Sequence, residues 1–477
     1  MYRMSRPRER DVRNVRGLIG VLLLAAVLGA FTPVTAGSDR PQLGLGPTAA
    51  ANAGQALPGE LLLHVDPAVG ALAQRIMIDV GGQEEARLDE LGVVRLRLRE
   101  GLSLEKALDL YSRLPGVDYA EPNYRLKAQF VPNDPFYAAQ RWYYNLTEAP
   151  QAWDLDQGNP SVIVAVLDSG VDTTHPDLRD HIWRNPGEGV PNGIDDDKNG
   201  CVDDVQGCNF VQPADADPSC GPQPISPSNQ VADDSGHGTF VAGIIGAIGN
   251  NSIGVIGGAP GVTLLPVKVL DCTGAGTTAD AAAGVLYAAH MGAQVINLSF
   301  GGVDPSRTLQ EAIVTATGTF GAVVVAASGN QGTLGVTYPA RYPQVIAVGA
   351  SDRNPPDARA PFSNWGPQVD VVAPGVDLVS TVPQALCGGH WSCPLGQPYS
   401  AASGTSFASA QVAALAALIR SHSPALSTNE IRFLIRATAL PLPDDTTPGW
   451  AGAGRIRMRR ALEAILFQIG APGVTKD

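Results

Sequence analysis

Five short apolar runs, rich in β-branched residues, most strongly limit the fold of this chain. They cover residues 162–167, 264–270, 295–299, 322–327 and 345–350. Because polar and apolar residues do not alternate in them, both faces of each strand must be buried, as in a parallel sheet covered by helices. Helical stretches lie between the runs, for example at 278–291 and 307–318. This pattern predicts an α/β domain with a doubly wound, mostly parallel sheet and helices on both faces.

The beginning of the chain differs from the rest. Six Arg between residues 3 and 16 precede an apolar run at 18–31 and a short stretch of small residues that ends at Ala36. This order is typical of a secretory signal peptide, and the apolar run is shorter than the ~20 residues that a membrane-spanning helix needs. We expect residues 1–36 to be a signal peptide, residues 37–56 a linker, and the product to be secreted, either periplasmic or extracellular. An uncleaved membrane anchor is the alternative.

A separate small unit is predicted at residues 57–128. PGELLLHVDP and VVRLRLRE alternate like strands, whereas LSLEKALDLYSRL has apolar residues at helical spacing. The sequence therefore predicts a small α+β domain ahead of the larger α/β domain at 129–477.

The composition excludes two kinds of partner. The formal net charge is −13, and the acidic excess lies after residue 129. Because nucleic-acid binding needs clustered positive charge, we expect no nucleic-acid partner. With 44% hydrophobic residues the chain can bury a large core. No run after residue 36 is long enough to span a bilayer, so we expect no membrane contact once the signal is removed.

Three segments, in chain order, supply an acid, a base and a nucleophile. They are Asp168 in VLDSGVD, His237 in GHGTFVAG and Ser406 in SGTSFASA. A serine hydroxyl is a poor nucleophile, so it needs an imidazole to take its proton and a buried carboxylate to orient that imidazole. With this order and these frames, the sequence resembles the subtilisin-like serine peptidases (subtilases) over about residues 57 to 465. The resemblance implies a serine endopeptidase that hydrolyses peptide bonds of polypeptide substrates, and we expect a monomer.

The predicted strands and helices bring these residues to one edge of the sheet. Asp168, Ser299 and Asn330 lie at or just past the carboxyl end of a predicted strand, which is where open α/β sheets bind ligands. His237 and Ser406 each begin a predicted helix, and the free N–H groups of a helix start favour an anion. The resemblance implies that the Ser406 N–H and the Asn330 side chain form the oxyanion hole.

The resemblance also gives the small unit a role. Its closing segment, VDYAEPNYRLKA, is similar to the end of a subtilase propeptide. In that family the propeptide assists folding and then remains as an intramolecular inhibitor, and self-cleavage would fall within residues 125–133. A permanent accessory domain is the alternative.

A substrate cleft between two backbone segments is implied in the same way. Main-chain pairing with such segments recognises any extended peptide, and side-chain pockets then give selectivity. Thr337 matches a position on the floor of the primary pocket and Gln331 an uncharged rim position, so we expect a preference for medium apolar side chains. The expected substrate-binding residues are Gly274, Ala275, Gly276, Ser299, Phe300, Gly301, Gln331 and Thr337.

Two segments are predicted to bind calcium in a structural, not a catalytic, role. Residues 195–204 place oxygen-bearing residues at alternate positions with Gly200 at the sixth, as in an EF-hand loop, although Gln206 stands where the bidentate Glu would be. This segment resembles the Asp-rich calcium loop of some subtilases, and a solvated acidic turn is the alternative. Residues 250–255 match a second calcium loop of the family. The expected ligands are Asp195, Asp197, Asn199, Cys201, Asp203 and Asp204 at the first site and Asp177, Asn251, Ile253 and Val255 at the second.

Six cysteines in an exported chain indicate disulfides. Six Cys allow 15 pairings, and the sequence alone does not choose among them. Cys387 with Cys393 is the local pairing we expect. No Cys lies in a frame with a His, so a thiol nucleophile is not expected.

Departures from the family pattern are confined to the helix of the predicted nucleophile. Phe407, Ala410 and Gln411 replace the common Met, Pro and His, and none of them is a reacting group.

Two rival functions stay open. One is a catalytically silent binding protein on the same scaffold, and the other is a processing protease of narrow specificity, for example one that cleaves after basic residues.

Overall fold

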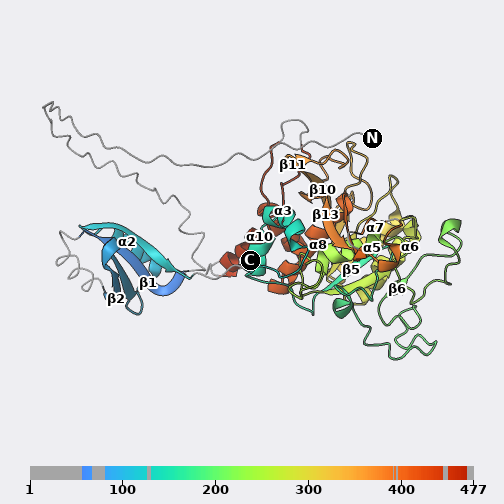
Figure 1. Cartoon of the computed structure of the whole chain (residues 1–477), viewed down its shortest axis with the longest axis horizontal. Helices are drawn as coiled ribbons and strands as arrows, with labels where there is room; N and C mark the ends of the chain where they lie inside the picture. Colours follow the sequence, from blue (N-terminus) through green and yellow to red (C-terminus); the bar gives the residue numbers. More distant parts are fainter. Residues whose placement is uncertain are drawn as a thin grey trace, which may run out of the picture. The chain divides into compact units, whose positions relative to one another are not determined.

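The computed structural model describes residues 56–66, 81–125, 130–389, 391–393, 396–443 and 449–469, without the side chains of 466–469. The chain divides after Arg125 into two compact units, and each is described by itself (Figure 1). The predicted signal peptide and the linker up to residue 55 lie outside the described residues. The proposed domain boundaries stay predictions.

In its described residues, the small unit is an antiparallel sheet with one α-helix. Its strands are β1 (Ala56–Val65), β2 (Gly82–Leu88), β3 (Val93–Leu98) and β4 (Val117–Tyr124), in the order β2-β3-β1-β4, and its helix is α2 (Leu104–Ser112). The two strands and the helix that the sequence predicted are confirmed. Strand β4 was not predicted, because its residues VDYAEPNY do not alternate cleanly, and it becomes a strand by pairing with β1.

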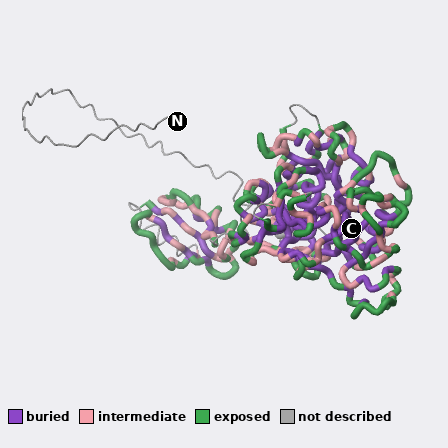
Figure 2. The backbone as a smooth tube through the Cα atoms, turned by 45° about the vertical axis from the view of Figure 1, so that its right-hand side comes forward, coloured by how far each residue is buried: buried purple, intermediate pink, exposed green. Residues whose placement is uncertain are grey.

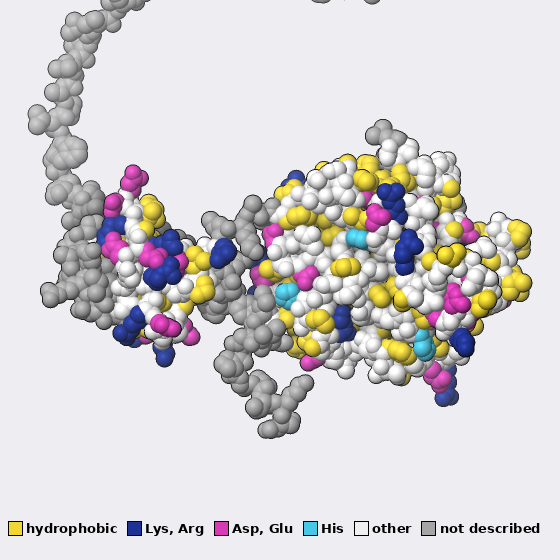
Figure 3. Space-filling model, turned by 90° about the horizontal axis from the view of Figure 1, so that it is seen from below, with side chains coloured by type: hydrophobic (Ala, Val, Ile, Leu, Met, Phe, Trp, Pro, Cys, Tyr) yellow, Lys and Arg dark blue, Asp and Glu magenta, His cyan; other side chains and the backbone are white. Residues whose placement is uncertain are grey.

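The two faces of this small sheet differ. Leu61, Leu63 and Leu96 are fully buried on one face, together with Ala107 and Tyr111 of α2. Charged side chains pair beside them: Arg95 lies 2.8 Å from Glu60, which Arg97 also contacts at 3.4 Å. In Figure 3 the basic and acidic side chains of the small unit lie side by side. Among the described residues of this unit, the core is therefore small and the charged side chains are ion-paired.

The large unit is built on an eight-stranded sheet. The order is β11-β10-β9-β8-β5-β7-β6, with β12 also paired to β10, and every pairing is parallel except that of β10 with β11. The mostly parallel sheet is thus confirmed. The strands are β5 (Ile163–Asp168), β6 (Cys208–Asn209), β7 (Thr263–Lys268), β8 (Val295–Leu298), β9 (Val323–Ala327), β10 (Val345–Arg353), β11 (Pro356–Arg359) and β12 (Val371–Pro374).

Helices cover both faces of this sheet. Along β5, Val164 and Val166 face the layer that contains α5 (His237–Gly246) and α8 (Thr405–His422), whereas Leu167 faces the layer of α6 (Thr278–His290) and α7 (Arg307–Gly318). Successive residues of a strand point to opposite faces, so an uninterrupted apolar run is what two covered faces require. Figure 2 shows buried backbone throughout the interior of this unit.

The remaining elements surround this body. They are α3 (Tyr137–Leu146), α4 (Ala149–Trp153), α9 (Thr428–Ala437), α10 (Met458–Ile469) and the antiparallel pair β13 (Leu378–Thr381) and β14 (Tyr399–Ala402). Within the described ranges, no helix is both long and apolar enough to cross a bilayer.

One predicted strand ends earlier than expected, and the reason bears on the site. The run 264–270 was predicted as a strand, but β7 stops at Lys268. The N–H groups of Val269 and Leu270 both donate to the carbonyl of Asp168, at 2.8 and 3.1 Å. The chain thus leaves the sheet at the end of β5 and leads into the segment at 274–276.

The six cysteines form three disulfides: Cys201–Cys208, Cys220–Cys272 and Cys387–Cys393. The local pairing predicted for Cys387 and Cys393 is confirmed. The other two pairings could not be chosen from spacing, because Cys220 and Cys272 are 52 residues apart and meet only in the folded chain.

Candidate active site

Three predicted site residues lie at or just after the ends of neighbouring strands. They are the acid Asp168, the substrate-segment residue Ser299 and the oxyanion donor Asn330. Asp168 is the last residue of β5, Ser299 directly follows β8, and Asn330 comes three residues after β9. Since β5, β8 and β9 are adjacent and parallel, their carboxyl ends lie at the same edge. This is the arrangement that the sequence predicted.

Asp168 and His237 form a close pair. The imidazole Nδ1 lies 2.7 Å from Oδ1 of Asp168, whose side chain is fully buried, whereas about a quarter (26%) of the His237 side chain is exposed. The same oxygen accepts the backbone N–H of Ser169 at 2.8 Å. Oδ2 of Asp168 is buried with no hydrogen-bond partner among the described residues. A buried carboxylate on Nδ1 fixes the tautomer and leaves the outer ring nitrogen free to act as a base.

Two carboxylates act on the pKa of His237. Burial lowers this pKa, but the charge of Asp168, the hydrogen bond from Nδ1 and the charge of Asp233 raise it by more, so it lies above its usual 6.5. The protonated imidazole is therefore stabilised, as a group that must accept a proton requires.

Asp233 was missed by the sequence analysis and shapes the start of α5. Its Oδ1 accepts the N–H of Gly236 at 2.7 Å and the hydroxyl of Ser169 at 2.8 Å, and its Oδ2 accepts both the N–H and the hydroxyl of Thr239. Burial raises the pKa of Asp233, and these hydrogen bonds oppose that effect. An Asp a few residues before a helix, with a Thr in its first turn, was the available signal.

Ser406 is the second residue of α8 and only 6% exposed. Its hydroxyl donates to the carbonyl of Ser299 at 2.9 Å, and no hydrogen bond joins these two described side chains, Ser406 and His237. The ring of the next residue, Phe407, lies 5.5 Å from the imidazole of His237. The start of α8 thus lies against His237, and because the Ser406 hydroxyl is bonded to the Ser299 carbonyl, it would have to turn away before any proton transfer to the imidazole.

Asn330 is held so that its amide N–H₂ group is free to donate. Its Oδ1 accepts the backbone N–H of Thr405 at 2.9 Å and the Thr405 hydroxyl at 2.8 Å. Nδ2 of Asn330 lies near Gly404, because a Cβ built on this glycine would be 3.6 Å from it. Since the first N–H groups of a helix have no partner within the helix, the Ser406 N–H is also available beside it.

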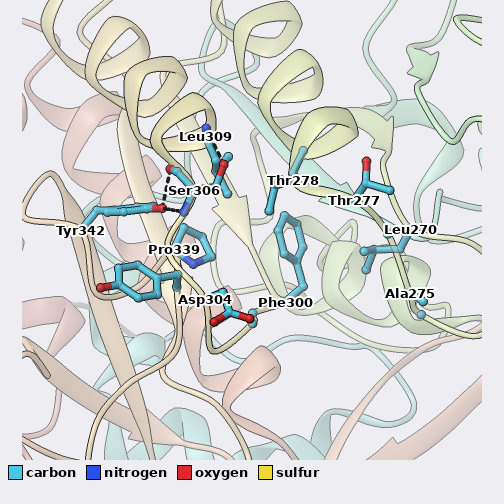
Figure 4. Close-up of a pocket in the computed structure, with 16 residues that line it drawn as sticks. Leu270, Ala275, Thr277, Thr278, Phe300, Asp304, Ser306, Leu309, Pro339 and Tyr342 are labelled. Carbon is cyan, nitrogen blue, oxygen red and sulfur yellow. Dashed lines mark hydrogen bonds between the residues drawn. The ribbon is translucent and has the colours of Figure 1, made fainter. Parts of the chain in front are cut away.

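The two predicted substrate segments line one cavity of about 250 Å³ (Figure 4). Gly274, Ala275 and Gly276 form one side, and Phe300 and Gly301 belong to the other. Figure 4 shows the Phe300 ring standing in this cavity, with the hydrogen-bonded pair Ser306 and Tyr342 beyond Pro339. Most of its walls are apolar, with Asp304 as an acidic lining residue.

Thr337 and Gln331 lie next to these segments. Thr337 is buried, and a Cβ at Gly301 would lie 2.3 Å from its hydroxyl oxygen, so Thr337 closes the space beside the 299–301 segment. Gln331 is exposed, and its side-chain oxygen accepts a hydrogen bond from Asn364 at 2.8 Å. Neither residue lines the cavity described above, and the floor and rim roles stay predictions.

The acidic loop brings together only some of its predicted ligands. Carboxylate oxygens of Asp197 and Asp204 lie within 4.8 Å of each other and of Glu188, which the sequence analysis missed because it lies outside the alternating segment. Asp195 and Asp203 instead accept backbone N–H groups, at Gly200 and Gly193 for example, each at 2.9 Å. Burial raises the pKa of Asp204, and neighbouring Asp197 raises it further against the hydrogen bonds that lower it.

The second predicted calcium site is gathered around Asp177. Its two oxygens accept the side-chain N–H₂ of Asn251 and the N–H of Val255, each at 2.9 Å. Asp134, another residue that the sequence analysis missed, is buried nearby and accepts the N–H of Asn250 at 2.9 Å. Burial raises the pKa of Asp177 to about 6, and the charge of Asp134 adds to the effect. Asp177 and Asp134 are thus two buried carboxylates that interact electrostatically, and their oxygens accept N–H groups in this structure.

Family models match most of the chain. The model described as the subtilase family matches residues 159–458, and the model described as the fervidolysin N-terminal prodomain matches residues 45–123.

Several named proteases are also similar to this chain in sequence or structure. The chain is 40% identical over 337 residues to a thermophilic serine proteinase of Bacillus sp. (strain AK1), covering 71% of each chain. It is 36% identical over 334 residues to thermitase of Thermoactinomyces vulgaris, covering 70% of this chain and all of that one. A solved structure of proteases from Pseudoalteromonas arctica PAMC 21717 is similar with a TM-score of 0.58 and 30% identity, over 70% of this chain and 99% of that chain.

Proposed function

The chain belongs to the subtilase family of serine peptidases, and from this premise we propose that it is a secreted endopeptidase with an Asp168, His237 and Ser406 triad, made as a self-processing zymogen. The single observation that carries the proposal is the 2.7 Å contact of a fully buried carboxylate with His237, whose ring also contacts Phe407, the residue after Ser406.

The proposed reaction follows from the side chains. His237 takes the proton of the Ser406 hydroxyl once that hydroxyl turns away from the Ser299 carbonyl, and the oxygen attacks the scissile carbonyl carbon. The C–N bond then breaks as His237 gives the proton to the leaving amine. Water, activated by the same imidazole, hydrolyses the acyl-enzyme. Asp168 stays ionised throughout and stabilises the imidazolium.

Two donors stabilise the negative oxygen of the tetrahedral intermediate. One is the Ser406 N–H at the start of α8, and the other is Nδ2 of Asn330, whose opposite end is anchored on Thr405. Preorganised donors of this kind contribute more than groups that must reorient during the reaction. Anchoring on Thr405 is therefore the feature that makes Asn330 an effective donor.

The proposed substrates are extended polypeptides. The backbone at 274–276 and 299–301 pairs with the peptide main chain, and the cavity between these segments accepts apolar side chains. A library of peptides distinguishes broad apolar cleavage from the narrow cleavage after basic residues that the acidic loop also allows.

The small unit supports the zymogen part of the proposal, because it matches a family prodomain. We propose that it is the intramolecular inhibitor, that it is removed by cleavage within residues 125–133, and that a signal peptide at 1–36 directs export. The three disulfides agree with an oxidising compartment.

We propose that calcium stabilises the large unit without taking part in bond cleavage. Glu188, Asp197 and Asp204 would hold one ion, and Asp134, Asp177 and Asn251 would contribute to the other. Calcium would supply positive charge to carboxylates that are otherwise close to one another in a partly buried setting.

The test compares the full chain with its Ser406→Ala variant. The wild type is expected to lose the region before about residue 133 and to hydrolyse casein, whereas the variant keeps its full length after signal removal and has no measurable activity. Mass spectrometry and a casein assay give the two readouts. Equal processing of both forms would reject self-maturation, and an active variant would reject the triad.

A further inference from the structure

A disulfide-closed loop carries a tryptophan to the first turn of the helix that begins with His237. The loop runs from Cys387 to Cys393, and Trp391 lies within it. The indole N–H of Trp391 donates to the carbonyl of Ser235 at 2.8 Å. Ser235 comes two residues before His237, so this hydrogen bond holds the backbone from which the imidazole projects.

Gly236 lies between these two residues and fits under the indole only because it has no side chain. It precedes α5 with a φ of 88°, in the left-handed region that favours glycine. A Cβ at Gly236 would lie 2.2 Å from Nε1 of Trp391. The indole is therefore in direct contact with the turn that starts the helix.

A series of aromatic contacts, one stacked and two tilted, connects Trp391 with both helices of the proposed triad. Its indole is stacked on Phe240 of α5, with ring centroids 5.3 Å apart and planes at 21°. Phe240 lies 4.4 Å from Phe407 of α8, and Phe407 lies 5.5 Å from the imidazole of His237. Phe407 stands where the common family pattern has Met. In this chain an aromatic ring therefore takes the place of a thioether beside His237.

The loop itself is braced. The N–H of Gly388 donates to the carbonyl of Trp391 at 3.0 Å, and the N–H of Trp391 donates to the carbonyl of Leu386 at 3.3 Å. The disulfide joins residues only six positions apart. Beyond the loop, the hydroxyl of Ser400 donates to the carbonyl of Ser392 at 2.8 Å. Three hydrogen bonds and one disulfide thus hold the described backbone of residues 386–389 and 391–393.

We propose that Trp391 is a positioning residue for His237, and that the Cys387–Cys393 disulfide holds it in place. The inference rests on the proposed role of His237 as the general base. Trp391 touches no reacting atom. It fixes the Ser235–Gly236 turn, and thereby the angle at which the imidazole meets the Ser406 hydroxyl and the leaving amine. Orientation of this kind acts on turnover and leaves ground-state substrate binding unchanged.

The experiment uses the mature wild type and three variants: Trp391→Phe, Trp391→Ala and the double variant Cys387→Ala/Cys393→Ala. The matched control is Trp142→Phe, which also removes an indole N–H, in this case one that donates to the Asp377 carbonyl at 3.4 Å in another part of the unit. A chromogenic peptide gives kcat and KM, an irreversible serine reagent counts the active sites, and thermal unfolding is followed in parallel.

We expect Trp391→Ala to lower kcat by about 10- to 100-fold with KM within about twofold of the wild type. Trp391→Phe keeps the ring stack but loses the N–H, so its kcat falls less. The double cysteine variant loses a similar factor to Trp391→Ala, and adding Trp391→Ala to it causes little further loss. The control keeps the wild-type kcat.

Three results would overturn the inference: an unchanged kcat in Trp391→Phe and the double cysteine variant, a rise in KM with constant kcat, or an equal loss in Trp142→Phe. Should Trp391→Ala not fold, Trp391→Phe and the cysteine pair still decide the question. Failure of the triad itself is seen separately, as activity that survives in Ser406→Ala.

Discussion

The two units of this chain bury their sheets to very different extents. In the small unit α2 and one face of four strands enclose a thin core that includes Leu61, Leu63 and Tyr111, and charged side chains cover much of the rest. In the large unit both faces of the sheet are covered, and α5 and α8 are buried along nearly their whole length. A small core gives a domain a low free energy of unfolding. A large core can hold side chains in fixed positions at the edge of the sheet. This difference agrees with the proposal that the small unit is cleaved off and that the large unit carries the active site.

The largest expected effect compares the same substitution in each core, in the full-length Ser406→Ala background so that both units are retained. Leu61→Ala and Leu298→Ala each remove a fully buried side chain and are expected to cost about 2–5 kcal/mol. We expect Leu61→Ala to unfold the small unit, because this cost is comparable with the whole stability of a small domain. Calorimetry should then show one transition fewer in Leu61→Ala and a shifted but retained transition in Leu298→Ala. Two retained transitions in both variants would mean that the small core has more reserve than its size indicates.

The next effect is confined to the edge of the large unit. Asn330→Ala is expected to lower kcat by about 10²- to 10³-fold, because one of two oxyanion donors is lost. KM should stay close to that of the wild type, whereas the unfolding temperature should fall, because the buried N–H and hydroxyl of Thr405 lose their acceptor. A kcat within a factor of three of wild type would remove Asn330 from the oxyanion hole.

Removal of calcium should lower the stability of the large unit and leave that of the small unit unchanged. Excess chelator is expected to destabilise the large unit by about 2–3 kcal/mol, the value for loss of a ligand present at about 100 times its Kd. The small unit contains none of the predicted ligands, so its transition should not move. Calorimetry of Ser406→Ala with and without chelator measures both at once. Equal shifts of the two transitions, or no shift of the large one, would contradict the calcium proposal.

A smaller effect concerns pH. The pKa of His237 is raised above 6.5, so the imidazole is protonated and inactive as a base at a pH where an ordinary histidine would be half neutral. We expect kcat/KM to rise with pH through a midpoint above 6.5. The same shift makes folding more favourable below pH 6.5, and this contribution is lost as pH rises through the folded-state pKa. A midpoint at or below 6.5 in the free enzyme would contradict the raised pKa.

The smallest effect is expected on the surface of the small unit. Arg97→Gln removes contacts with Glu60 and Glu85, but half of the Arg97 side chain is exposed and water screens both pairs. We expect no resolvable change in the unfolding temperature. The matched Glu60→Gln, at a side chain that is 7% exposed and also bonded by Asn123 at 2.8 Å, should lower it measurably. A large loss in Arg97→Gln would show that the ion pairs, and not the thin core, hold this unit together.

The sequence predicted what depends on local pattern. Apolar runs with two buried faces identified the strands of the large sheet, and motif frames identified Asp168, His237 and Ser406, because strand ends and helix starts follow from the chain nearby. It also anticipated that Asp168, Ser299 and Asn330 would share an edge, since parallel neighbours place their carboxyl ends together.

What the sequence did not predict depends on how the folded chain turns and packs its side chains, both locally and between distant segments. Glu188 and Asp134 join acidic side chains that lie elsewhere in the sequence, and the alternating pattern at 195–204 gave no sign that Asp195 and Asp203 would turn to backbone N–H groups. The contact of Trp391 with the start of α5 arises only when residues more than 150 positions apart meet. Such contacts are set by packing and not by spacing.

The carbonyl of Ser299 has a consequence for how this peptidase would rest between turnovers. It now accepts the hydroxyl of Ser406, yet it belongs to the segment along which a peptide strand would pair. An arriving amide N–H would compete for that acceptor and release the hydroxyl toward His237. Substrate binding and release of the Ser406 hydroxyl would then occur together. Acylating reagents without an N–H group would meet a hydroxyl that is still bonded to the Ser299 carbonyl.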